Sequence, residues 1–377
     1  MRGLERGDIA ATDPALIYHL DRCLGCRGCE PVCPSGVQYG HGLEAARARI
    51  TAERGVSRLA RVALWTLTTP GVSGAVYLLA RLLRATGLPR LFAGWGRIRF
   101  ALGMLAATKG GGNGREQAVK GGRLRGPHTA HSRPLPPRTA QLFRGCVMQG
   151  LFSHVHEATR RTLGVNGYET REVPGQVCCG ALHEHAGLAD EARALARTNV
   201  EAFGDGDEPI VVNSAGCGAL MKAYGRLLGD ERSERFAARV KDVTELLAAP
   251  SPVPGAPLDL HVAYDPPCHL LHAQGIAVQP LKLFAAIPLL ELVPVPGAAE
   301  CCGSAGLFTL LEPEMSRAVL SAKLERLREA APQVVATGNP GCLMQIGAGL
   351  AAAGIRARVR HPVELLDDAY RAAGRYE

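Results

Sequence analysis

Two cysteine doublets, each followed by glycine, are the residues of this chain with the clearest capacity for chemistry. They are Cys178-Cys179-Gly180 and Cys301-Cys302-Gly303. Each doublet has a lone cysteine upstream and another downstream, with gaps of 31 and 37 residues in the first copy and 32 and 39 in the second. Such uneven spacing, occurring twice, indicates two equivalent sites. Four thiolates per site are the ligand set that holds an iron–sulfur cluster.

A different cysteine pattern lies near the N-terminus. Residues 23 to 34 follow the spacing Cys-x2-Cys-x2-Cys-x3-Cys-Pro, which is typical of bacterial-type [4Fe–4S] ferredoxin modules. Zinc is the alternative, but four ligands within eleven residues fit poorly with the paired spacing of zinc sites. In two-cluster ferredoxins the fourth cysteine of a run serves the other cluster. Cys33 therefore either completes its own cluster or lacks one, and both interpretations stay open.

The composition is that of a globular protein of two or three domains, with 377 residues of which 47% are apolar. The N-terminal residues show no apolar export segment, so we expect a cytoplasmic protein whose cysteines are ligands rather than disulfides. A net charge of +8 suits an acidic partner subunit or an anionic membrane surface. Nucleic acid is disfavoured, because aromatic residues make up only 5% and do not alternate with basic ones.

The region between the N-terminal cysteines and the doublets is expected to be helical and then unstructured. Residues 41–54 have the apolar periodicity of a helix. Residues 62–80 carry no charge, a length close to a membrane span, but Pro70-Gly71 interrupts them. We expect two short helices that meet there, and ordinary packing, an interfacial surface and a true span all remain possible uses. Arg81, Arg84, Arg90, Arg97 and Arg99 would suit an anionic surface or a solvated face. Residues 110–137 have the Gly- and Pro-rich composition of a linker.

From residue 139 the chain is a duplication, with matching segments offset by about 119 to 125 residues. Each copy alternates short β-branched runs with helical stretches, such as 188–203 and 312–330, which predicts parallel strands with crossover helices. The cysteines come directly after the apolar runs, where parallel sheets bind ligands. Cys217 and Cys342 are expected to open helices, whose N-termini favour thiolates. The glycines at 180, 216, 303 and 341 are expected to leave room for a cluster.

These patterns resemble a known family. The repeated motif is similar to the cysteine-rich CCG domain of heterodisulfide reductase subunits. Together with the run from Tyr18 to His41 and with Asn213-Ser-Ala-Gly-Cys217-Gly, the layout resembles the iron–sulfur subunits of glycolate oxidase over essentially the whole chain. Two departures stand out. The fuller CCG pattern has a further cysteine where this chain has Ser214 and Asn339, which favours cubane [4Fe–4S] clusters over the noncubane type. The family also carries two ferredoxin runs, of which only the second is seen in this chain.

The resemblance implies an electron-transfer subunit of a flavin-dependent glycolate dehydrogenase, with FAD in partner chains, the inner face of the cell membrane nearby and quinone as the acceptor. No Gly-x-Gly-x-x-Gly motif for a flavin follows a strand in this chain. The alternatives are a subunit for lactate or glycerol 3-phosphate oxidation, a thiol–disulfide reductase, which Ser214 and Asn339 disfavour, and a zinc-binding interaction protein. Six histidines are candidates for quinone or proton contacts, with surface or supporting roles as the ordinary alternative: His154, His156, His183, His185, His269 and His272.

The predicted architecture is thus α/β: a small α-helical ferredoxin-type [4Fe–4S] module (1–56), a helical segment with a Gly/Pro-rich linker (57–138), and two duplicated α/β CCG domains (139–250 and 251–377). No catalytic residue is predicted in this chain. The predicted cluster ligands are Cys23, Cys26, Cys29, Cys33, Cys146, Cys178, Cys179, Cys217, Cys268, Cys301, Cys302 and Cys342.

Overall fold

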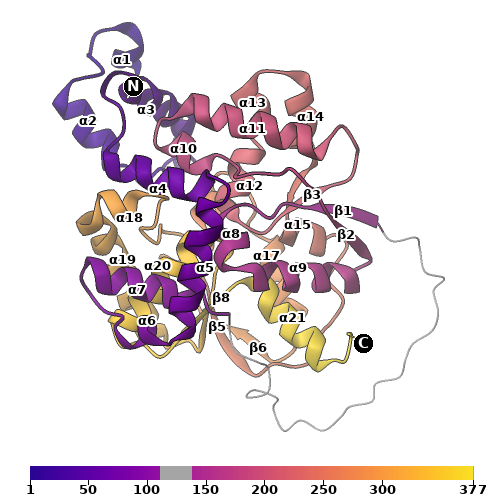
Figure 1. The fold of residues 1–377 in the computed structure, drawn as a ribbon. Coiled ribbons are helices and arrows are strands. Elements are labelled where there is room, and N and C mark those ends of the chain that lie inside the picture. Colours follow the sequence, from indigo (N-terminus) through magenta and orange to yellow (C-terminus); the bar gives the residue numbers. More distant parts are fainter. Residues whose placement is uncertain (111–137, 377) are drawn as a thin grey trace.

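The duplication predicted from the sequence forms two parallel four-stranded sheets (Figure 1). The structure is a computed structural model that describes residues 1–110 and 138–376; apart from Gly110, the predicted linker lies outside the described residues. The first sheet has the order β2-β1-β3-β4 and the second the order β6-β5-β7-β8, with every pair parallel. The strands are β1 (Arg138–Leu142), β2 (Tyr168–Glu172), β3 (Ile210–Val212), β4 (Val240–Asp242), β5 (Leu260–Tyr264), β6 (Leu290–Leu292), β7 (Val334–Ala336) and β8 (Arg358–Arg360).

Two of the inner strands, β3 and β7, form where the sequence has short runs of β-branched residues. All three residues of β3 are buried, and so are all three of β7, as expected for strands covered on both faces. Helices connect the strands in both halves. In the first half they are α8 (Val147–Leu151), α9 (Ser153–Val165), α10 (Ala181–His185), α11 (Ala189–Phe203), α12 (Ala215–Met221), α13 (Tyr224–Leu228), α14 (Glu231–Arg239) and α15 (Val243–Leu247). In the second half they are α16 (Cys268–Leu271), α17 (Gln279–Ala285), α18 (Phe308–Leu311), α19 (Pro313–Ala330), α20 (Pro340–Ala352) and α21 (Pro362–Ala372).

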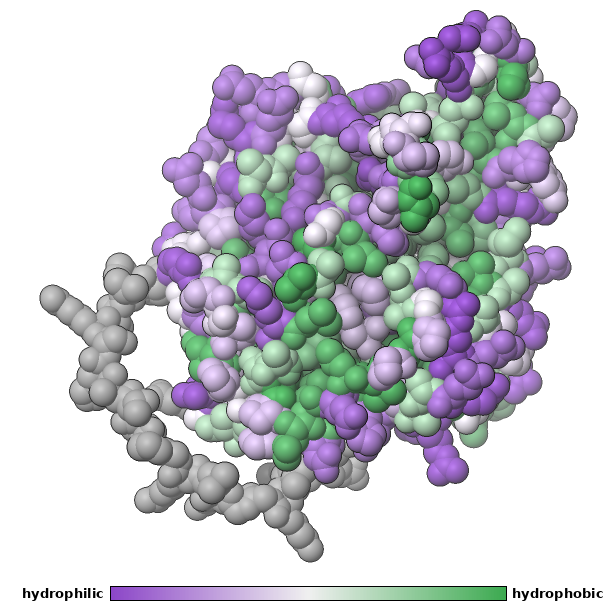
Figure 2. All heavy atoms as spheres, turned by 180° about the vertical axis from the view of Figure 1, so that it is seen from behind, coloured by the Kyte–Doolittle hydropathy of each residue, from purple (hydrophilic) through white to green (hydrophobic). Residues whose placement is uncertain are grey.

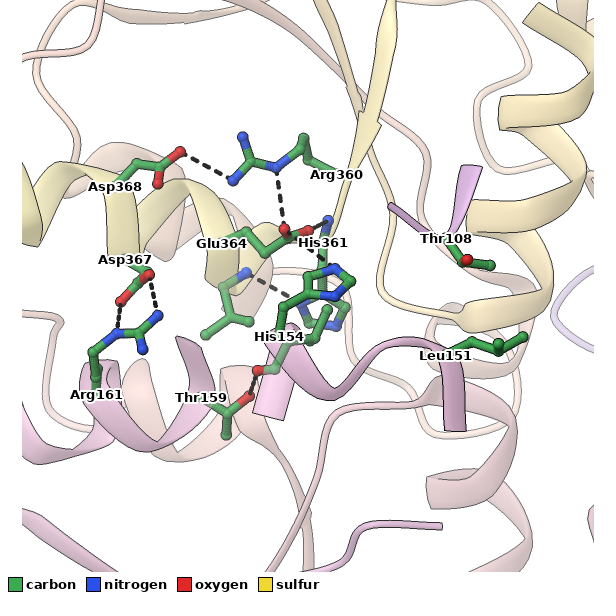
Figure 3. Close-up of polar contacts among 12 residues, drawn as sticks. Thr108, Leu151, His154, Thr159, Arg161, Arg360, His361, Glu364, Asp367 and Asp368 are labelled. Atoms are coloured by element: carbon green, nitrogen blue, oxygen red, sulfur yellow. Dashed lines mark hydrogen bonds and ion pairs between the residues drawn. The ribbon is translucent and has the colours of Figure 1, made fainter. Parts of the chain in front are cut away.

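Each half buries a hydrophobic cluster of its own, and the two halves also share a third one. One hydrophobic cluster contains Val155 and Leu163 of α9 together with Leu283 of α17 and Tyr370 of α21. At its rim, Arg161 of α9 donates to both carboxylate oxygens of Asp367 of α21, at 2.8 and 2.7 Å (Figure 3). Such a bidentate pair fixes the angle between the two helices. The halves are therefore held in one relative position.

The N-terminal module is a small helical unit, as predicted. It consists of α1 (Arg2–Arg6), α2 (Pro14–Asp21) and α3 (Tyr39–Arg54), and the cysteine run lies in the connection between α2 and α3. The predicted apolar face of α3 is confirmed, because Leu43, Ala46 and Ile50 are buried.

Two helices meet at Pro70-Gly71, also as predicted. They are α4 (Arg58–Thr68) and α5 (Val72–Ala85), bent by 91° relative to each other. Within the described residues no single helix has the length and apolarity to cross a membrane, although this bent pair passes the same test by length and composition alone. Next come α6 (Leu88–Leu91) and α7 (Arg97–Ala107), and α7 packs on α20 through small residues such as Gly103 and Ala348. In Figure 1 these helices lie across the front of the molecule.

Candidate functional site

A single cavity of about 300 Å³ lies between the two halves, and both cysteine tetrads line it. Within the tetrads the sulfurs come close: Cys146 Sγ is 3.5 Å from Cys178 Sγ, and Cys302 Sγ is 3.0 Å from Cys342 Sγ. The eight lining cysteines are Cys146, Cys178, Cys179, Cys217, Cys268, Cys301, Cys302 and Cys342.

The cysteines reach the cavity from the carboxyl ends of the strands, the usual ligand position in parallel sheets. Cys146 follows β1 and Cys268 follows β5. Cys217 lies in the first turn of α12 after β3, and Cys342 lies in the first turn of α20 after β7. Their predicted position at helix starts is thus confirmed. The doublets lie in the loops that precede α10 and α18.

The glycines after the doublets have a role different from the predicted one. Gly180 has φ +87° and Gly303 has φ +84°, which a side chain would strain. A Cβ atom at Gly303 would also lie 2.5 Å from the carbonyl oxygen of Ser316, and one at Gly180 would lie 3.2 Å from that of Ala192. These two glycines therefore let the doublet loops turn and pack against α11 and α19, rather than making room for a cluster.

The electrostatics of each tetrad favour one thiolate per doublet. The hydrogen bond from Cys146 lowers the pKa of Cys178 well below its usual value, with a further contribution from Cys179. In the second half the hydrogen bonds from Cys268 and Cys302 lower the pKa of Cys301 in the same way. A thiol group that loses a proton this readily is suited to bind a cationic iron centre, because the thiolate is the ligand.

Backbone N–H groups also point at the sulfurs, as in sites that stabilise anionic clusters. The N–H of Ala181 donates to Cys179 Sγ at 3.5 Å and that of Gly303 to Cys301 Sγ at 3.4 Å. Among the described residues, no three His, Cys, Asp or Glu side chains are grouped as the ligands of one metal ion are. Four thiols per half, thiolate-favouring contacts and a cavity between them fit iron–sulfur clusters.

In the N-terminal run, three of the four predicted ligands lie near one another and the fourth stands apart. Burial raises the pKa of Cys26 against a hydrogen bond from the N–H of Gly28, and the nearby Cys301, Cys23 and Cys29 raise it further. The pKa of Cys33 is instead lowered by backbone N–H groups of residues 35–37, and no other cysteine contributes. The role of Cys33 as a ligand therefore stays a prediction.

Arg47 of α3 fastens this run to the first half, a role that the sequence did not indicate. Its guanidinium donates to the carbonyl oxygens of Cys23 at 2.6 Å, Leu20 at 2.9 Å and His185 at 3.3 Å. The neighbouring Thr51 hydroxyl donates to the carbonyl oxygen of Ala186 at 3.0 Å. The run also approaches the second half, since a Cβ atom at Gly28 would lie 3.5 Å from His272 Nε2.

The candidate histidines are mostly internal. His185 and His269 both line the cavity, with ring centroids 5.2 Å apart, and burial lowers the pKa of each to about 4. His156 is held by the carbonyl of Arg144 at 2.9 Å and by the amide of Asn213 at 3.0 Å. His183 is buried, whereas His154 lies 3.6 Å from Glu364 (Figure 3). Burial lowers the pKa to about 4 in His156, His185 and His269. These three rings are therefore neutral at physiological pH and are poor proton donors there.

Two further side chains at the site were not predicted. Tyr77 of α5 lines the cavity beside Cys146 and Cys178, and its hydroxyl has no hydrogen-bond partner within the described residues. Lys323 of α19 forms a buried ion pair with Asp265 beside the second tetrad. Burial disfavours the charge of Lys323, but Asp265 more than offsets this and raises the pKa of the ammonium. The sequence predicted a short helix in the uncharged stretch that contains Tyr77. It did not predict the direction of the Tyr77 side chain, because local sequence does not determine which way one residue of an apolar helix points.

Comparison with known proteins agrees with this site. The model of the cysteine-rich domain CCG matches residues 140–222 and 262–347. The probable glycolate oxidase iron–sulfur subunit of Bacillus subtilis is 32% identical over 94% of this chain and 82% of its own length. The glycolate oxidase iron–sulfur subunit of Escherichia coli is 30% identical over 93% of this chain and 82% of its own. Lactate utilization protein A of Geobacillus thermodenitrificans is 31% identical over 60% of this chain and 97% of its own.

Proposed function

The chain belongs to the family of glycolate oxidase iron–sulfur subunits, and on that premise we propose that it is the electron-transfer subunit of a flavin-dependent glycolate dehydrogenase. In this proposal glycolate is oxidised to glyoxylate at FAD in partner subunits, and the electrons leave to a quinone at the inner face of the cell membrane. The observation that carries it is the convergence of two cysteine tetrads on one cavity. Bound [4Fe–4S] clusters would supply one-electron transfer.

The residues of this chain have a supporting role in that reaction. Cys146, Cys178, Cys179 and Cys217 would hold one cluster, and their equivalents in the second half would hold another. Cys23, Cys26 and Cys29 would hold a third, with Cys33 as its predicted fourth ligand. Apolar side chains of the cavity wall, such as Met148 and Leu307, would limit the access of water to the clusters. A dry, hydrogen-bonded surrounding is what sets the reduction potential of such a cluster.

A lactate-oxidising complex is the second candidate, because lactate utilization protein A matches this chain over 97% of its own length. The substrate would bind in the flavin-containing partner, so the residues of this chain do not distinguish glycolate from lactate. The partner subunit would determine which acid is oxidised.

The test is anaerobic purification of the chain with its flavin-containing partner, followed by iron and sulfide analysis and EPR spectroscopy. Cys179→Ser and Cys302→Ser are each expected to lose one cluster signal and to retain the others. Reduction of a dye by glycolate, measured beside lactate, identifies the substrate. Stoichiometric zinc without acid-labile sulfide would overturn the cluster assignment, and lactate-only activity would favour the second candidate.

A further inference from the structure

Helices α4 to α7 carry an unusual concentration of exposed apolar side chains. Twelve of the twenty-three exposed large hydrophobic residues within the described part of the chain fall between Leu59 and Ile98. We call these twelve the apolar patch. They include Trp65 of α4, Leu79 of α5 and Leu91 of α6, which are 53%, 66% and 74% exposed. Single exposed apolar residues are ordinary, but twelve of them within forty residues of the chain indicate an interaction surface.

The charges around the apolar patch are of one sign. From residue 54 to residue 110 the sequence has eight arginines and one lysine and neither aspartate nor glutamate. Arg58, Arg61, Arg90 and Arg97 are exposed, and none forms an ion pair or side-chain hydrogen bond with any residue that the structure describes. They are free to meet negative charge outside the molecule.

The helices lie along the surface of the molecule with one side fixed to it. In α4 the side chains of Ala60 and Leu64 are buried while Val62 and Trp65 are exposed. In α5 the Tyr77 ring packs on Gly150, and Arg81 donates to the carbonyl oxygens of Gly150 and Gln149 at 2.7 and 2.8 Å. Figure 1 shows α4 and α5 meeting at a sharp angle, with the body of the protein behind them.

This geometry suits a helix pair in the plane of a membrane rather than across it. The two helices have 11 and 14 residues and so reach about 16 and 21 Å, which is short of a hydrocarbon core of about 30 Å. Their 91° bend prevents them from adding their lengths. Apolar residues on one side and arginines at the border are the pattern of interfacial helices on anionic lipid, and Trp65 suits the headgroup level.

We propose that the apolar patch and its free arginines dock this chain on the surface of an anionic lipid bilayer. The charge pattern favours lipid over a protein partner, because a phosphate-rich surface matches a segment without acidic residues. The other face of the molecule also has a hydrophobic area, low in the view of Figure 2. This inference concerns the helices alone and holds whichever hydroxy acid the complex oxidises.

The test is flotation of the full chain, purified with its iron, on vesicles of phosphatidylcholine with or without phosphatidylglycerol. Binding is expected to the anionic vesicles and to weaken at high salt. Leu79→Glu with Leu82→Glu is expected to abolish it. Arg90→Gln with Arg97→Gln is expected to weaken it roughly thirtyfold. The matched controls change exposed residues outside the apolar patch and are expected to bind as the wild type: Val278→Glu with Leu281→Glu, and Arg171→Gln with Arg197→Gln.

A second measurement does not depend on any charged variant. Trp65 and Trp95 are the only tryptophans of the chain, so Trp95→Phe leaves Trp65 as the single reporter. Brominated lipid is expected to quench Trp65 in anionic vesicles. Equal binding to neutral and anionic vesicles, or absence of quenching, would overturn the proposal. So would an α5 variant that binds vesicles normally but loses its flavin-containing partner, since the apolar patch would then be a subunit interface.

Discussion

Asn339 connects the two halves of the chain at the cavity, because it hydrogen-bonds both Cys342 of its own half and Gly216 of the other. Its Nδ2 atom donates to Cys342 Sγ at 3.6 Å, while its Oδ1 atom accepts from the N–H of Gly216 at 3.1 Å. Gly216 directly precedes Cys217 of the other tetrad. The residue that stands where the fuller pattern has a cysteine therefore links a sulfur of one tetrad to the backbone beside the other.

Replacement of Asn339 by alanine is expected to lower the free energy of unfolding by about 1–3 kcal/mol, because the N–H of Gly216 loses its acceptor. Denaturant titration under anaerobic conditions measures the loss. Ser214 is the equivalent residue of the first half, and its buried side chain makes no hydrogen bond within the described residues. Ser214→Ala is therefore expected to cost less than about 0.5 kcal/mol. Equal losses in the two variants would contradict the bridging role.

Features carried by local sequence could be predicted, and features carried by long-range packing could not. The β-branched runs at β3 and β7 and the break at Pro70 determine their own local structure, and the structure confirms both the repeated parallel sheets and the bent helix pair. The repeat predicted two equivalent cysteine sites. That both sites open on one cavity depends on contacts such as Arg161 with Asp367, which lie 206 residues apart.

The sequence also did not predict the direction in which single side chains point. Tyr77 and Leu79 belong to the same apolar stretch, yet Tyr77 enters the cavity and Leu79 faces outward. Arg47 lies in a helix that the sequence predicted, but its contacts with three carbonyl oxygens were not predicted. Gly180 and Gly303 were assigned to the cluster and serve helix packing. Each outcome depends on a neighbour that lies far away in the sequence.

Tyr77→Phe is expected to lower the reduction potential of the cluster proposed at the first tetrad by about 50 mV. Burial raises the pKa of Tyr77, so its hydroxyl stays protonated and can donate to sulfur. A donated hydrogen bond stabilises the more negative, reduced state, and its loss lowers the potential. An EPR-monitored redox titration measures the shift. Tyr264 is a matched control, because its hydroxyl is also buried without a partner among the described residues but does not line the cavity. An equal shift in Tyr264→Phe would contradict the prediction.

Gly187→Ala is expected to loosen the N-terminal module from the first half. Gly187 has φ +78°, and a Cβ atom there would collide with the carbonyl oxygen of Arg47. Gly167 has φ +81° with nothing within 4 Å, so Gly167→Ala imposes the same backbone strain without the collision. We expect Gly187→Ala to cost about 1–3 kcal/mol more and to speed hydrogen exchange in α3. Equal exchange in the two variants would show that the contact does not hold the module.

The helix that follows the last strand of each sheet begins with a different capping residue. The two capping residues make the free energy of unfolding depend on pH in opposite directions. Asp242 caps α15 and His361 caps α21, each in a capping box. Burial raises the pKa of Asp242 to about 6, although hydrogen bonds from Thr244 and the charge of Lys222 oppose this and Glu245 adds to it. Burial lowers the pKa of His361 to about 3, against a hydrogen bond to the carbonyl of Asn213. Figure 3 shows His361 beside Glu364 and His154.

Asp242 binds its proton more tightly in the folded state, so its contribution to stability is complete at low pH and is lost as the pH rises through about 6. His361 binds its proton more weakly when folded, so its contribution is complete above about 6.5 and is lost as the pH falls toward 3. Between pH 4 and pH 7 the contribution of each group to the free energy of unfolding changes by about 3 kcal/mol, and the two changes offset each other in the wild type.

Asp242→Asn is therefore expected to make the free energy of unfolding rise with pH by about 3 kcal/mol more than in the wild type. His361→Asn is expected to make it rise by about 3 kcal/mol less. Denaturant titrations at pH 4, 5, 6 and 7 measure both slopes, and slopes that change in the same direction would show that one of the two groups does not titrate from its buried position.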